Sequence, residues 1–173
     1  MDRDSIEERL YKWDKKHTDV LKTFYMENTV KTTVLDHIIQ IFLTNPKLEL
    51  ATSWLLKHHF DQGQTVRQEE LDQLLQSIGE LTYWESLLHL LQIIPKLTLT
   101  VKQAMVLEPA IRKLLNSENK FVKAASYEAY FEVVKLFPDL KREFILMCNG
   151  ALDRESAAVK VKIKRILKAL NPQ

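Results

Sequence analysis

Signals that begin a helix recur at short intervals along the whole sequence, and they constrain the fold more than any other feature. In a capping box, a Ser or Thr side chain and a Glu or Gln three residues later each bond the other's free backbone N–H group. Four such pairs occur: Ser5/Glu8, Thr65/Gln68, Thr82/Glu85 and Thr100/Gln103. Asn45 and Pro46 are typical of an N-cap followed by the first helical residue. Gly63 and Gly79 are expected just beyond helix C-termini.

The apolar residues between these signals recur with the period of a helix, and no segment alternates like a strand. Only 3 glycines and 5 prolines are present, too few for the turns of a β-sandwich or barrel. We therefore predict an all-α fold of about ten helices, packed as antiparallel neighbours because the links are short. One long helix over the first two segments is the alternative. The predicted helices span 5–16, 18–27, 29–44, 46–62, 66–78, 82–94, 100–116, 119–137, 139–151 and 154–170.

The sequence also contains an internal match at an offset of 40 residues, where the segment from Leu74 overlays the segment from Leu114 without gaps. A weaker match at an offset of 37 pairs Val122 with Val159. A two-helix unit that repeats at this spacing is typical of an α-solenoid, whose units bury their apolar faces by stacking on one another.

Residues 107–125, LEPAIRKLLNSENKFVKAA, resemble one repeat of the HEAT family. Pro109 lies where the first helix of such a repeat carries a kinking proline, and Val122 to Ala125 lie where its second helix opens. Ser117 stands where the family usually has Asp. The resemblance implies a right-handed α–α superhelix, a HEAT-like solenoid of helix pairs, in a single domain over residues 1–173. It says little about activity.

Two of the predicted helices are apolar in nearly every direction, as helices packed between neighbours are. Each keeps one narrow polar strip, which in a solenoid lines the concave side. We therefore predict a non-catalytic scaffold or adaptor that binds a protein or peptide partner along these strips. The strip residues are Glu85, His89 and Gln92 in 82–94, and Glu128, Glu132 and Lys135 in 119–137.

Positive charge is concentrated in the last third of the chain. Residues 119–173 carry eleven cations and six anions, a net +5, whereas the whole chain carries +2. The basic face of the last predicted helix is either a solubilising face on a terminal helix or a site for an anionic partner. Nucleic acid is the alternative partner, because such cations neutralise phosphates. The cations of this alternative are Lys120, Lys123, Lys160, Lys164, Arg165 and Lys168.

HEAT-like folds include DNA-alkylation-repair glycosylases, and a relation to them is part of the nucleic-acid alternative. No catalytic motif of that family is matched residue by residue in this sequence. Nothing resembles a Gly-rich phosphate loop, a nucleophile elbow or a dinucleotide fingerprint either. We therefore expect no enzymatic activity; a small-molecule enzyme of another class is the third alternative.

The side chains that most often bind metals or cofactors are expected to pack instead. His58 shares an apolar helix face with Trp54, and the histidines have no metal-binding spacing. Trp13, Trp54 and Trp84 are expected in the core, with base stacking or peptide binding as the alternative. The single cysteine, Cys148, lies in an apolar run and is expected to be buried and unreactive. We predict no metal and no cofactor.

The sequence shows neither a membrane-spanning segment nor a secretory signal. No stretch approaches the roughly 18 uninterrupted apolar residues of a membrane helix. The N-terminus, MDRDSIEERLYKW, carries charges where a signal peptide needs an apolar run. A cytoplasmic, monomeric protein that does not enter a membrane is the resulting expectation.

Overall fold

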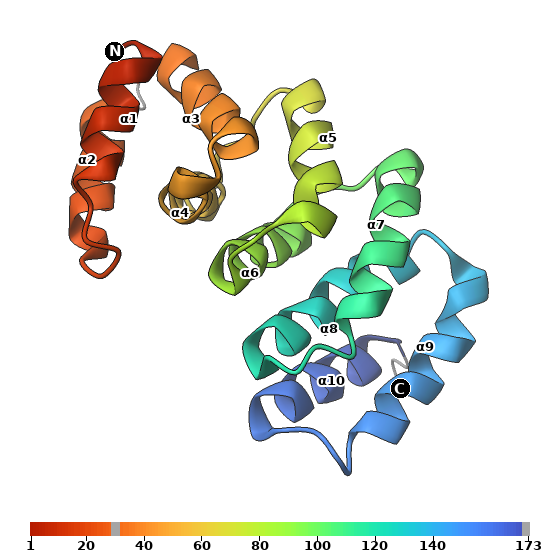
Figure 1. Cartoon of the computed structure of the whole chain (residues 1–173). Coiled ribbons are helices and arrows are strands. Elements are labelled where there is room, and N and C mark those ends of the chain that lie inside the picture. Colours follow the sequence, from red (N-terminus) through yellow and green to blue (C-terminus); the bar gives the residue numbers. More distant parts are fainter. Residues whose placement is uncertain (29–31, 171–173) are drawn as a thin grey trace. The chain divides into compact units, whose positions relative to one another are not determined.

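Figure 1 shows the computed structural model of the chain, which describes residues 1–28 and 32–170. The described residues form ten α-helices and three short 3-10 segments, with no strand among them. The prediction of an all-α fold is confirmed. No helix in this described part has the length and apolar character that crossing a membrane requires.

The helices fall into two compact units, Met1–Ile93 and Ile94–Gln173, and each is described by itself. The single domain over 1–173 stays a prediction. In the first unit, α4 packs against α2, α3 and α6, and α1 packs against α3. The elements of this unit are α1 (Arg3–Tyr11), α2 (Thr18–Asn28), α3 (Thr32–Thr44), η1 (Pro46–Leu48), α4 (Glu49–Asp61), α5 (Gln68–Gln76), η2 (Ser77–Glu80) and α6 (Trp84–Ile93).

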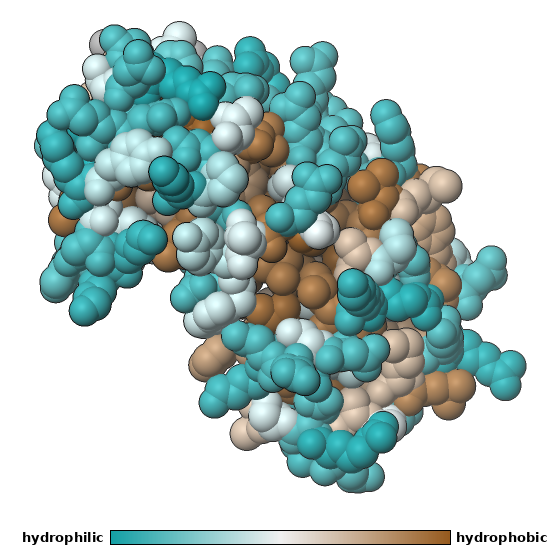
Figure 2. Space-filling model, in the orientation of Figure 1, coloured by the Kyte–Doolittle hydropathy of each residue, from teal (hydrophilic) through white to brown (hydrophobic). Residues whose placement is uncertain are grey.

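The second unit is built around α8, which packs against α7, α9 and α10. Nine of the fifteen residues of α8 are buried, as its apolar sequence predicts. Apolar side chains also reach the surface of this unit and gather over α7 (Figure 2). The elements are η3 (Ile94–Lys96), α7 (Val101–Leu114), α8 (Lys120–Val134), α9 (Pro138–Ala151) and α10 (Ala157–Leu170).

A polar network ties α7 and α9 to the central helix α8. The hydroxyl of Tyr130, a buried residue of α8, donates to Glu108 of α7 over 2.7 Å. Arg112 of α7 donates to Glu108 over 2.6 Å and to both carboxylate oxygens of Glu143 of α9, over 2.7 and 3.1 Å. Burial and the Glu108 carboxylate raise the pKa of Tyr130 well above its ordinary value. These contacts hold the helix pairs of this unit in register.

The predicted helix boundaries agree with the structure to within a few residues, apart from the N-terminal region. The first two helices are separate, because Asp14 accepts the backbone N–H groups of Lys16 and His17, both over 3.0 Å, and closes a turn. Lys15 in this turn has a left-handed backbone, with φ at 62°. The predicted first helix therefore ends too late, at 16 rather than at Tyr11. The predicted start of the third helix at residue 29 lies outside the described residues.

One of the four predicted capping boxes is confirmed and three are wrong. Thr100 and Gln103 bond each other's backbone N–H groups over 3.2 and 2.9 Å. At the start of the other three helices, a carboxylate outside the predicted pair accepts the free backbone N–H group, since an ionised oxygen is the stronger acceptor. Asp2 replaces Ser5 as the cap of α1, Glu70 accepts from the backbone of Arg67 at α5, and Thr82 is bound by Glu49.

The two glycines predicted at helix ends behave differently. Gly63 follows α4 with φ at 72°, a conformation that a residue without Cβ adopts freely. Its N–H donates to Phe60 O and the next N–H, of Gln64, donates to His59 O, which is the Schellman closure of a helix. Gly79 lies inside the 3-10 segment η2 and has no left-handed backbone, so its predicted role is wrong.

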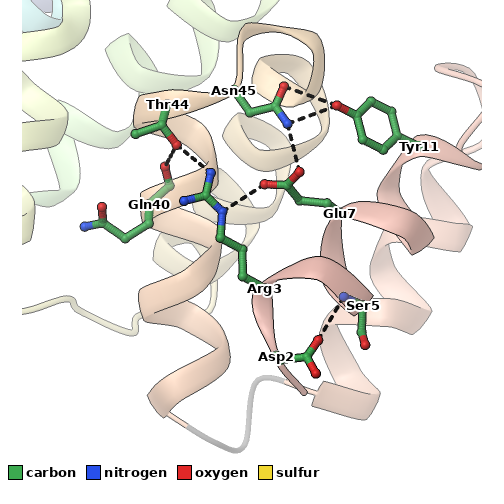
Figure 3. Close-up of polar contacts among 8 residues, drawn as sticks. All are labelled: Asp2, Arg3, Ser5, Glu7, Tyr11, Gln40, Thr44 and Asn45. Carbon is green, nitrogen blue, oxygen red and sulfur yellow. Dashed lines mark hydrogen bonds and ion pairs between the residues drawn. The ribbon is translucent and has the colours of Figure 1, made fainter.

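A second polar network fixes α1 on the end of α3 (Figure 3). Arg3 donates to Glu7 over 2.9 Å and to the hydroxyl of Thr44 over 2.8 Å. Asn45 precedes Pro46, as predicted, but its side chain makes no cap. It donates instead to Glu7 over 3.1 Å and to the hydroxyl of Tyr11 over 3.0 Å. The Asn45 side chain therefore connects the end of α3 with α1 and does not cap the following helix.

Candidate functional site

One residue of the predicted strip on α6 makes a partly buried polar contact with α4. Glu85, His89 and Gln92 are all half-buried. His89 Nδ1 lies 3.0 Å from the hydroxyl oxygen of Ser53 on α4. Ser53 is fully buried and also donates to Leu50 O over 3.0 Å. The serine and histidine therefore connect two packed helices, and a substrate cannot reach this hydroxyl as a nucleophile.

Burial makes His89 a pH-sensitive element of the first unit. Desolvation lowers the pKa of His89 from 6.5 to about 4. Between these values the unfolded chain binds a proton that the folded chain does not, so stability falls as pH drops below 6.5. From pH 7 to pH 5 we expect a loss on the order of 2 kcal/mol from this group. Urea unfolding of the wild type and of His89→Gln at both values measures it; equal losses in the two proteins would contradict it.

The predicted strip on α8 is engaged in ion pairs within the second unit. Glu128 lies 2.9 Å from Lys162 and 3.9 Å from Arg165, both on α10. Glu132 pairs with Lys135 one turn away. Glu132 and Lys135 also line an open cavity of about 200 Å³ with residues 97–99 and 136. The strip residues of α6 and α8 belong to different units, and their role in binding stays a prediction.

The same contacts neutralise part of the predicted anion-binding set. Of the set, Arg165 lies near Glu128, which also pairs with Lys162, a cation outside the set. Lys123 pairs with Glu155 over 2.9 Å. The remaining cations of the set are less constrained by carboxylates. Lys160 donates to Asp153 O over 3.4 Å, Lys120 lies over the ring of Phe121, and Lys164 and Lys168 are exposed without an ion pair among the described residues.

Exposed apolar side chains on α7 and α9 were not singled out by the sequence. On α7, Val101, Met105 and Val106 are exposed, Met105 by 64%. On α9, Leu146 is 65% exposed. Pro138, Lys141, Arg142, Ile145 and Leu146, called the α9 groove below, line an open volume of about 370 Å³. The signal in the sequence is their spacing along one helical face, which is separate from the stripe of Phe144, Cys148 and Ala151 that is buried.

The histidine of the Trp54 face is packed as predicted, although its neighbour is the more buried of the two. The His58 ring stacks on Trp54 with centroids 5.1 Å apart. His59 is buried and held on both ring nitrogens, 2.9 Å from the Tyr25 hydroxyl and 3.0 Å from Thr65 O. Within the described residues, no group of three or more His, Cys, Asp or Glu side chains is placed to hold a metal ion.

The remaining side chains singled out by the sequence are mostly structural. Cys148 is buried, and desolvation raises the pKa of its thiol from 9.0 to about 12, which keeps it protonated and unreactive. The Trp13 indole donates to His17 O over 3.0 Å. Trp84 is exposed at the start of α6, so the expected core position is wrong for this residue.

The described residues form an all-helical protein in which some large apolar side chains of α7 and α9 are exposed. Comparison with protein-family models, curated proteins and solved structures gives no match.

Proposed function

We propose that this chain is a non-catalytic helical-repeat module that binds a protein partner, with helix pairs stacked as in a HEAT-like solenoid. The packing of α8 between α7 and α10 supports the repeat, because an inner helix of a solenoid contacts the helices of two successive units. The internal sequence match at an offset of 40 supports the same architecture. A cytoplasmic location and a monomeric state accompany the proposal as predictions.

The observation that carries the binding proposal is the apolar surface of α7. Val101 and Met105 are one turn apart, and Val106 extends the surface sideways. Water solvates a cluster of large apolar side chains unfavourably. Such exposed patches mark sites where proteins associate. Lys102 and Lys113, also exposed on this helix, give the patch a polar border.

Selection from a random peptide-display library against the whole chain tests this function. We expect enriched peptides rich in apolar and aromatic residues. Met105→Glu should weaken their binding about tenfold or more, because it places a charge at the centre of the patch. Lys113→Glu, at the border, is the matched control and should change binding by less than about threefold. Failure to enrich any peptide would contradict protein binding.

Nucleic-acid binding is the second candidate, and the exposed cations Lys164 and Lys168 on α10 favour it. A labelled duplex of about 20 base pairs should then bind at about 50 mM salt and be released steeply at about 200 mM. Lys164→Glu/Lys168→Glu should abolish this binding. We expect no such binding at either salt, because Glu128 and Glu155 already occupy three of the cations near this surface. Tight, salt-sensitive binding would promote this candidate over the first.

A further inference from the structure

The α9 groove is made by the outer face of one helix. Its residues recur at i, i+3, i+4, i+7 and i+8, the spacing with which a helix presents one face to a partner helix. Ile145 and Leu146 form its apolar end, and Pro138 begins the helix at the other end. The volume in front of this face, about 370 Å³, is open to solvent.

The charges on this face are positive. Lys141 and Arg142 are exposed, and neither has an ion pair among the residues that the structure describes. Of the two carboxylates of this helix, Glu143 is engaged toward α7. Arg112 binds Glu143 through both carboxylate oxygens, over 2.7 and 3.1 Å, and these hydrogen bonds, together with the positive charge of Arg112, lower the pKa of Glu143. Asp139, which is exposed, is the carboxylate left near the edge of the groove. An acidic ligand therefore meets two unpaired cations and one carboxylate.

Packing and an ion pair also fix the position of α9, the helix that forms the groove. Phe144, Cys148 and Ala151, on the neighbouring face of α9, are buried against the rest of the second unit. The ion pair from Arg112 to Glu143 fixes the middle of the helix to α7. A binding surface that is already formed loses little conformational entropy when a ligand docks.

We infer that the α9 groove binds an acidic amphipathic helix of a partner protein. The apolar residues of that helix contact Ile145 and Leu146, and its carboxylates contact Lys141 and Arg142. The inference rests on the proposed protein-binding function and names the class of partner for one of its surfaces. Apolar contact supplies most of the affinity in this mode of recognition, and the charges select the ligand.

Two designed peptides of about 18 residues test this inference by fluorescence anisotropy with the whole chain. Both carry Leu at helical spacing on an alanine background, with Glu in one and Lys in the other. We expect the acidic peptide to bind at least about tenfold more tightly than the basic one. Lys141→Glu/Arg142→Glu should reverse that preference. Leu146→Ser should weaken binding of the acidic peptide about tenfold, since a leucine anchor is lost.

The matched control is Lys164→Glu/Lys168→Glu, which makes the same change of net charge on exposed residues of α10. It should change acidic-peptide binding by less than about threefold. Equal loss in both double variants would show general charge attraction and overturn the inference. Equal binding of the two peptides would also overturn it. In a parallel titration with lipid vesicles, binding of the chain to vesicles that contain anionic lipid, with no binding of either peptide, would overturn it as well. Display-selected peptides that respond to Met105→Glu but not to Leu146→Ser would overturn this inference while leaving the proposed function standing.

Discussion

Replacing Phe144 with alanine should lower the free energy of unfolding of the second unit by about 3–5 kcal/mol. Phe144 is fully buried on α9, and its ring lies 5.1 Å from the centroid of Tyr130 and 6.2 Å from that of Tyr127, both on α8. Truncation removes the transfer free energy of a phenyl ring and leaves a cavity lined by rigid aromatic rings, which cannot collapse to fill it. Urea unfolding followed by far-UV circular dichroism measures the loss.

Leu146→Ala, two residues further along the same helix, is the control for this experiment. Leu146 is mostly in water, so its truncation should change the free energy of unfolding by no more than about 0.5 kcal/mol. Similar losses in the two variants would mean that α9 does not pack on α8 through the face described above.

Replacing Glu49 with alanine should lower the stability of the first unit by about 3 kcal/mol. Glu49 is only 4% exposed at the start of α4. Its carboxylate accepts the hydroxyl and the N–H of Thr82, over 2.6 and 3.1 Å, and the N–H of Tyr83 over 3.0 Å. These donors lie at the start of α6, where backbone N–H groups have no partner within the helix. Alanine leaves them without an acceptor and also removes a charge that the helix dipole stabilises.

Tryptophan fluorescence reports this unfolding, since the 3 tryptophans, Trp13, Trp54 and Trp84, all lie in the first unit. Glu49→Gln keeps one acceptor oxygen and should lose roughly half as much stability. Glu80→Ala, at an exposed glutamate close in sequence, should cost less than about 0.5 kcal/mol. If Glu49→Ala costs no more than Glu80→Ala, the carboxylate does not cap α6.

The helices could be predicted from the sequence because their signal is local. The apolar period of α8 and the capping box of Thr100 and Gln103 are both contained within one helix and its first turn. The cap of α6 is not, because Glu49 lies 33 residues before Thr82 and comes beside it only through packing of α4 on α6. The local pattern of a threonine and a glutamate three residues later therefore predicted the wrong carboxylate for the cap of α6.

The candidate site was harder to predict for the same reason. The pairing of Glu128 with Lys162, and of Lys123 with Glu155, joins residues more than thirty positions apart and decides which cations are free. On α9 the sequence alone does not distinguish Phe144, which is buried, from Leu146, which is exposed. That distinction depends on which face α8 and α10 cover.

Protein binding through α7 and α9, rather than anion binding through α10, can be decided by one titration. A display-selected peptide and a duplex of about 20 base pairs are each titrated with the chain at about 50 and about 200 mM salt. We expect the peptide to bind at both salts, with affinity lost in Met105→Glu/Leu146→Glu and kept in Lys164→Glu/Lys168→Glu. A duplex that binds more tightly than the peptide, falls steeply with salt and is lost only in the α10 variant would contradict protein binding.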